Sequence, residues 1–153
     1  MAVKNDRITF SYLKRLNEEI KSNNPIRQNK AYQALSEINH NGLNPGLLMY
    51  IYYLQGKYHY LDFKRDDNLK SIAAAVECYR LVFQTARQHR VFAKNPKYYF
   101  KYAESLHKLS QYTFCLFEQN KLHNKAYLIA IHSSNKFPES TSLQWLKHHI
   151  LAN

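Results

Sequence analysis

The sequence predicts an all-α protein of about six or seven helices that pair as antiparallel hairpins, in a short repeat stack or a compact bundle. Apolar residues recur at helical spacing along most of the chain, and short breaker segments separate the helical stretches. With three glycines and four prolines, the chain lacks the frequent turn residues of a β-sandwich. The 153 residues and 45% hydrophobic content predict a single globular domain over 1–153.

Three helices are expected in the first part of the chain. They cover 8–21, 27–40 and 47–61. Pro25 follows two asparagines and ends the first segment, and the Asn/Gly/Pro-rich run 41–46 separates the second from the third. The third segment is rich in tyrosine, which is typical of strands, but its length and its lack of strict alternation favour a helix.

The second part of the chain continues the helical pattern. The expected helices cover 67–88, 96–120, 124–136 and a short segment around 143–150. Residues 62–67 are charged and are expected to form a connector, with Asp66 or Asp67 as the N-cap of the next helix. Pro96 suits a first helical turn, and Pro138 follows a helix end.

Two pairs of residues have the spacing of a known helical repeat. Tyr52 precedes Gly56 by four residues, and an aromatic and a small residue at this spacing let two helices approach. Ala126 precedes Pro138 by twelve residues, the spacing of the small residue in a repeat's second helix and the proline that closes the repeat. The helix pairs also recur about every 40 residues. In these features, residues 8–140 resemble tetratricopeptide repeats, and the resemblance implies a short stack of helical hairpins.

The match to this family is incomplete. Gln55, Phe114 and Lys121 stand where the family usually has a leucine, a small residue and a turn glycine. The connector 62–67 and the helix after Pro96 are also longer than the family's own. An ordinary antiparallel bundle, in which the alanines and aromatic residues are simply core, stays open as the alternative.

The family resemblance implies a partner-binding groove in the middle repeat. The residues that it places there are Tyr50, Tyr53, Lys57 and Tyr60. Such a groove could hold a peptide through apolar contact, hydroxyl hydrogen bonds and charge. Alternatively, these tyrosines pack between helices, as many of the thirteen tyrosines must.

The formal net charge is +11, and much of the excess lies between residues 80 and 108. The expected basic surface consists of Arg80, Arg87, Arg90, Lys97 and Lys101. Arg80 and Arg87 share one helical stripe, and Lys97 and Lys101 share another, so two neighbouring helices could form one positive surface. An acidic protein partner would fit this surface, and so would nucleic acid. A solvated surface without a partner is the remaining interpretation.

Two short motifs resemble the small helical subunits of type III CRISPR effector complexes. They are Asn41-Gly42-Leu43 and Trp145-Leu146-Lys147. This resemblance implies a basic subunit that lines a guide-RNA or target-strand path without catalysis. A nucleic-acid-binding subunit of a ribonucleoprotein is therefore the alternative to a protein-binding adaptor.

No motif for catalysis, a cofactor or a metal is found. Phosphate-binding glycine motifs and the zinc-protease and serine-hydrolase motifs are absent from the sequence. His107, His123 and His132 lack metal-ligand spacing, although the fold could bring them together. We therefore expect a protein that is not an enzyme and holds no cofactor.

The sequence also indicates a compartment. No apolar run approaches the ~20 residues of a membrane span, and no signal-peptide pattern opens the chain. Cys78 and Cys115 lie in apolar helical patterns without CxxC spacing, so both are expected to be buried free thiols. A cytoplasmic location without membrane contact follows as the expectation.

Overall fold

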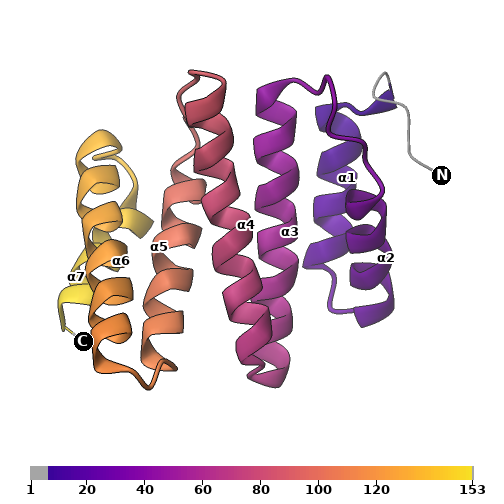
Figure 1. Ribbon diagram of the computed structural model, residues 1–153. Helices are drawn as coiled ribbons and strands as arrows, with labels where there is room; N and C mark the ends of the chain where they lie inside the picture. Colours follow the sequence, from indigo (N-terminus) through magenta and orange to yellow (C-terminus); the bar gives the residue numbers. More distant parts are fainter. Residues whose placement is uncertain (1–6, 153) are drawn as a thin grey trace.

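A computed structural model describes residues 7–152 and confirms the all-α prediction, with seven helices in that range (Figure 1). They are α1 (Phe10–Lys21), α2 (Pro25–Ser36), α3 (Pro45–Asp66), α4 (Leu69–Gln88), α5 (Pro96–Gln111), α6 (Leu116–Lys136) and α7 (Thr141–Ala152). None of these helices is both long and apolar enough to cross a membrane.

Asparagine residues are the N-caps of four of the helices. The Oδ1 atoms of Asn24, Asn44, Asn68 and Asn95 each accept a hydrogen bond from the backbone N–H two residues later, at 2.8–3.0 Å. In α2, α3 and α5 the next residue is proline, which needs no N–H partner and has a backbone angle suited to a helix. This Asn-Pro pair therefore fixes three helix starts locally.

The charged segment 62–67 belongs mostly to α3, so the predicted connector and N-cap are wrong. Phe63 is buried, and Arg65 pairs with Asp62 at 2.6 Å along the helix surface. The helix ends at Asp66, the C-cap residue Asp67 adopts a left-handed conformation with φ of 49°, and Asn68 caps α4. The turn between α3 and α4 is consequently very short.

The prediction of one continuous helix over 96–120 is wrong, because α5 ends at Gln111 and a separate helix, α6, begins at Leu116. The break contains neither glycine nor proline. The Thr113 hydroxyl donates a hydrogen bond to the carbonyl oxygen of Leu109 in the last turn of α5, at 2.8 Å. Phe114, which lies in this break, is fully exposed at 100%.

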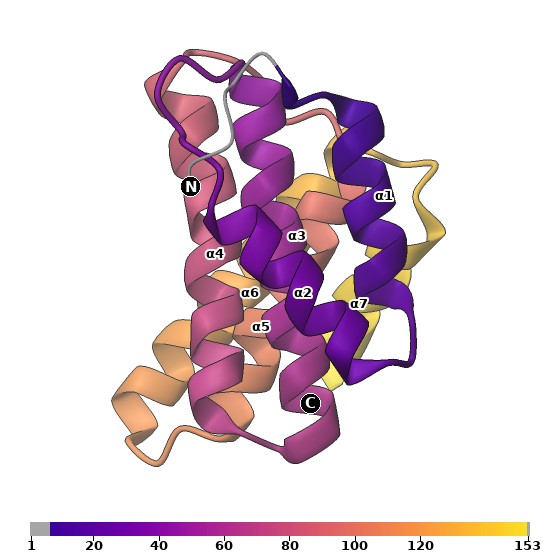
Figure 2. The ribbon, with the colours of Figure 1, turned by 90° about the vertical axis from the view of Figure 1, so that its right-hand side faces the viewer.

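Successive helices pack as antiparallel hairpins in a stack. Helix α1 contacts α3, α3 contacts α5, and α5 contacts α7, whereas α2, α4 and α6 make no backbone contact with one another in the described range. Viewed along the stack, α1 and α7 lie to one side and α4 and α6 to the other (Figure 2). We call these sides the odd-helix face and the even-helix face.

Helices α3 and α4 approach most closely at Gly56. A β-carbon built there would lie 2.5 Å from Cε1 of Tyr79, which is itself completely buried. The expected close approach of two helices at Gly56 is thus confirmed. The buried residues on both sides of this contact belong to one hydrophobic core that reaches from Ile8 to Ile150.

Candidate functional site

The four residues predicted to line a groove lie together on α3, but two of them are core residues. The exposed fraction is 5% for Tyr53 and 6% for Tyr60, and burial raises the pKa of both phenols. The Tyr53 ring lies 4.8 Å from that of Tyr98 on α5. Tyr53 and Tyr60 therefore pack between helices, while Tyr50 and Lys57 are only half-buried.

Lys57 is the polar centre of the odd-helix face. Its ammonium donates a hydrogen bond to Asn17 Oδ1 at 2.7 Å and lies 5.6 Å from the centre of the Tyr53 ring. Burial, together with the nearby ammonium groups of Lys21 and Lys101, lowers the pKa of Lys57 to about 8. An anion bound at this face would stabilise the charged form of Lys57.

Lys101 and Lys97 also belong to the odd-helix face. The Lys101 ammonium lies 4.8 Å from the centre of the Tyr60 ring and 5.7 Å from that of Phe100. It also pairs with Glu104 at 3.2 Å. Lys97 is exposed in the first turn of α5 and is near enough to Lys57 to lower the pKa of that lysine.

The two basic stripes do not form the single surface that we considered. Arg80 and Arg87 border a pocket between α4 and α6, whereas Lys97 and Lys101 lie beside the tyrosines of α3. The physical reason is the orientation of α5. It directs its lysines toward α3 and packs two tyrosine rings against Phe83 of α4.

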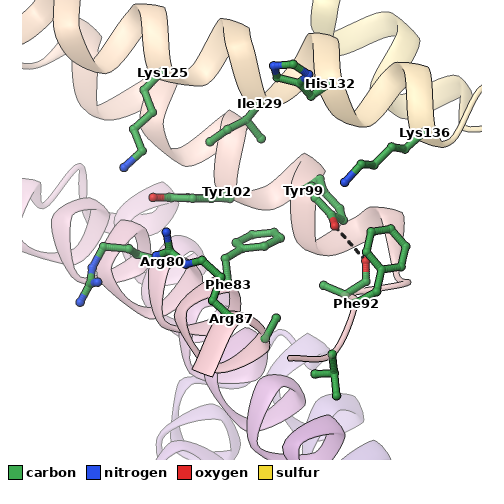
Figure 3. Close-up of a pocket in the computed structure, with 13 residues that line it drawn as sticks. Arg80, Phe83, Arg87, Phe92, Tyr99, Tyr102, Lys125, Ile129, His132 and Lys136 are labelled. Carbon is green, nitrogen blue, oxygen red and sulfur yellow. Dashed lines mark hydrogen bonds between the residues drawn. The ribbon is translucent and has the colours of Figure 1, made fainter. Parts of the chain in front are cut away.

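The pocket between α4 and α6, which we call the even-helix groove, has a volume of about 450 Å³ (Figure 3). Its floor comes from α5 and the loop before it. The apolar lining is Phe83, Ala86, Val91, Phe92, Ala93, Tyr99, Tyr102 and Ile129. The basic lining is Arg80, Arg87, Lys125, His132 and Lys136. No carboxylate contributes to the lining in the described part of the chain.

The arginines of the groove differ in how well their charge is compensated. Arg80 binds Glu77 on its own helix, with two hydrogen bonds of 2.9 and 2.6 Å. Arg87 is exposed and forms no ion pair within residues 7–152. Arg90, the last predicted basic residue, follows the end of α4 with φ of 53° and lies outside the lining.

The aromatic rings of the groove are covered on part of their surface by other side chains of the same site. Lys125 lies 5.6 Å from the centre of the Tyr102 ring, and Lys136 lies 4.8 Å from that of Phe92. Phe83 stacks on Tyr102 with ring centres 5.4 Å apart and an interplanar angle of 21°. The groove therefore offers a ligand ring edges, aliphatic carbons and the uncovered part of Phe92, whose exposed fraction is 50%.

Sequence reasoning missed the contribution of α6 to this site. Lys125, His132 and Lys136 stand at i, i+7 and i+11, which places them on one helical stripe. The same test that identified Arg80 and Arg87 would have found this stripe. What the sequence could not show is that α4 and α6 leave a groove between them.

Of the three histidines that we considered from the sequence, His107 and His123 lie close together. The third histidine beside them is His149 rather than His132. The His107 ring lies 5.6 Å from that of His123 and 5.8 Å from that of His149, centre to centre. His132 lines the even-helix groove instead. In the described residues, no group of three histidine, cysteine or acidic side chains could hold a metal ion.

The two cysteines have different environments. Cys78 is partly buried, and its burial raises the pKa of the thiol to about 12. Cys115 is exposed at the start of α6, so the expectation that both thiols are buried is wrong for this residue. Neither cysteine forms a disulfide.

Comparison with known protein families, characterised proteins and solved structures gives no significant match. The tetratricopeptide and CRISPR-subunit resemblances thus stay predictions from the sequence.

Proposed function

We propose that the protein is a non-catalytic adaptor or assembly subunit that binds an acidic segment of a partner protein in the even-helix groove. The observation that carries this proposal is an apolar floor bordered by Arg87, Lys125 and Lys136, none of them paired with a carboxylate in residues 7–152. Unpaired cations around an apolar pocket favour a ligand with both carboxylates and apolar groups. The free thiols are compatible with the cytoplasmic location that we expect.

The cover over the buried Tyr102 ring favours a protein partner over nucleic acid at this groove. A base would need an exposed ring face on which to stack. The Tyr102 ring stacks on Phe83, and the Lys125 ammonium lies over it. The Lys136 ammonium lies over the Phe92 ring. An apolar side chain needs no free face and gains from the ring edges alone.

A nucleic-acid-binding subunit is the second candidate function, and a feature of the odd-helix face favours it. Trp145 shares a shallow hollow with Phe100, and the Lys101 ammonium lies 5.7 Å from the centre of the Phe100 ring, where it could contact a phosphate. The exposed fraction of Trp145 is 56%, which leaves ring surface for a base. Lys57 and Lys97 would supply phosphate contacts on the same face.

Charge reversal in the groove tests the first proposal. Fluorescence anisotropy would measure the binding of two labelled probes: peptides that alternate glutamate with phenylalanine, and oligo-uridine. Each probe would be tested with the variants Arg87→Glu, Lys125→Glu and Lys101→Glu. Lys30→Glu is the matched control, because Lys30 is exposed on α2, away from both sites. Truncation of Tyr53 is a poor probe of binding because the residue lies in the core.

The two functions predict opposite patterns in these measurements. If the groove binds acidic protein segments, Arg87→Glu and Lys125→Glu each weaken peptide binding about tenfold or more, and Lys101→Glu does not. If the protein binds nucleic acid through the odd-helix face, Lys101→Glu weakens oligo-uridine binding and lowers its salt slope by about one or more. Equal losses with Lys30→Glu would show that only net charge matters and would contradict both.

A further inference from the structure

The basic side chains of the even-helix groove lie at two ends of an apolar centre. Figure 3 shows Lys125 and Arg80 at one end, and Lys136 beside Phe92 at the other. Between the two ends, the lining is apolar, with Tyr102 of the floor and Ile129 of α6 together with neighbouring apolar side chains. A ligand that fills the groove would therefore meet positive charge, then apolar surface, then positive charge.

The centre of the groove is suited to one large apolar side chain. The whole groove has a volume of about 450 Å³, within the range for small-ligand pockets, about 300–1,000 Å³, so its centre has room for a large side chain. Tyr99 cannot easily rotate away, because its hydroxyl donates a hydrogen bond to the Ala93 carbonyl at 3.0 Å. The floor is therefore a fixed surface against which an anchor side chain could pack.

The helix geometry sets the distance between the two charged ends. Lys125 and Lys136 are eleven positions apart on α6, or about 16 Å at 1.5 Å per residue. Arg80 and Arg87 are seven positions apart on α4, or about 10 Å. An extended peptide advances about 3.3 Å per residue, so these lengths correspond to about three to five residues of a ligand chain.

We infer that the even-helix groove recognises an extended acidic segment in which one bulky apolar residue lies between two carboxylates, about three to five positions apart. This inference rests on the proposed function and specifies the partner's sequence. The apolar anchor fills the centre, and the carboxylates meet Lys125 at one end and Lys136 at the other. Arg87 reinforces the charge along α4, whereas Arg80 is partly neutralised by Glu77.

The test uses the full-length protein and a set of labelled peptides of equal length. The reference contains Glu-Ser-Phe-Ser-Glu, the anchor control replaces Phe by Ala, and the spacing control is Glu-Glu-Ser-Phe-Ser. We expect the reference to bind about tenfold or more tightly than the anchor control, because burial of a phenylalanine contributes a decade or more in affinity. The spacing control should fall between the two.

A double-mutant cycle locates the two ends. Lys125→Gln and Lys136→Gln are combined with peptides in which either glutamate is replaced by glutamine, and Lys30→Gln is the control. Each lysine should show coupling with one glutamate and little with the other. All three lysines are exposed, so the variants are expected to fold, and circular dichroism would verify this.

The outcomes separate this inference from the proposed function. If the anchor control binds as tightly as the reference and Lys125→Gln weakens both, the groove binds acidic segments without an anchor, and only the inference fails. If no acidic peptide responds to Lys125→Gln while oligo-uridine binds tightly, the proposed function fails with it. Coupling of each lysine to both glutamates equally would overturn the assigned spacing.

Discussion

At Gly56, the backbone of α3 lies directly against the ring of Tyr79 on α4. A β-carbon at this position would sit 2.5–2.9 Å from three ring atoms of Tyr79, and the ring is enclosed on all sides. The tyrosine hydroxyl is also buried without a hydrogen-bond partner in the described residues. Packing alone therefore holds this ring in place, and it cannot move aside at low cost.

Gly56→Ala should consequently destabilise the protein, although alanine is the better helix former. At an exposed helical site the change would stabilise by about 1 kcal/mol, whereas overpacking here should cost about 1–3 kcal/mol. Chemical denaturation of Gly56→Ala, Tyr79→Leu and the double variant would measure the coupling between the two residues. A Gly56→Ala protein of unchanged or greater stability would show that α3 and α4 do not meet this closely.

Three histidines meet where α7 packs on α5 and α6. His107 on α5 has an exposed fraction of 2%, and its Nδ1 has no hydrogen-bond partner in the described residues. It faces His123 on α6 and His149 on α7. Burial, together with the two neighbouring histidines and Lys108, lowers the pKa of His107 to about 4.

Acid should therefore weaken the docking of α7. Because the pKa of His107 is lowered on folding, its contribution to stability is complete above about pH 6.5 and is lost as the pH falls toward 4. Between about pH 7 and pH 5 this loss is on the order of 2 kcal/mol. The fluorescence of Trp145, which stacks on His149 at 4.7 Å and is the single tryptophan, would report the change.

His107→Leu removes the titrating group and should flatten the stability profile between these two pH values. His148→Gln is the matched control, because His148 is exposed on α7. An unchanged pH dependence in His107→Leu would show that another group, such as His40 or His59 with their lowered pKa values, controls the acid response.

Over the whole molecule, the sequence predicted the helical class well because helical periodicity is a local signal. The break at 112–115 was missed because it lacks glycine and proline and because Thr113 ends the helix through its side chain. The site was predicted only in part. Arg80 and Arg87 share a stripe that can be read from spacing, but the groove exists because α4 and α6 do not touch, which depends on tertiary packing.

The net charge of +11 predicts a salt dependence of stability for the whole protein. Mutual repulsion among the cations destabilises the compact state, and added salt screens it over about 10 Å at moderate ionic strength. The melting temperature should therefore rise between low and moderate sodium chloride concentrations. Lys30→Glu lowers the net charge by two units and should reduce this rise, whereas a fall in melting temperature with salt would contradict the argument.

The nearest-neighbour arrangement of the helices has a consequence for how the chain reaches its native state. Each helix touches only the helices one or two places away along the chain. Contacts between residues close in sequence cost little loop-closure entropy, and such chains usually fold within microseconds to milliseconds. During synthesis, α1 and α2 can pair before α5 has left the ribosome, so assembly can proceed in the direction of translation.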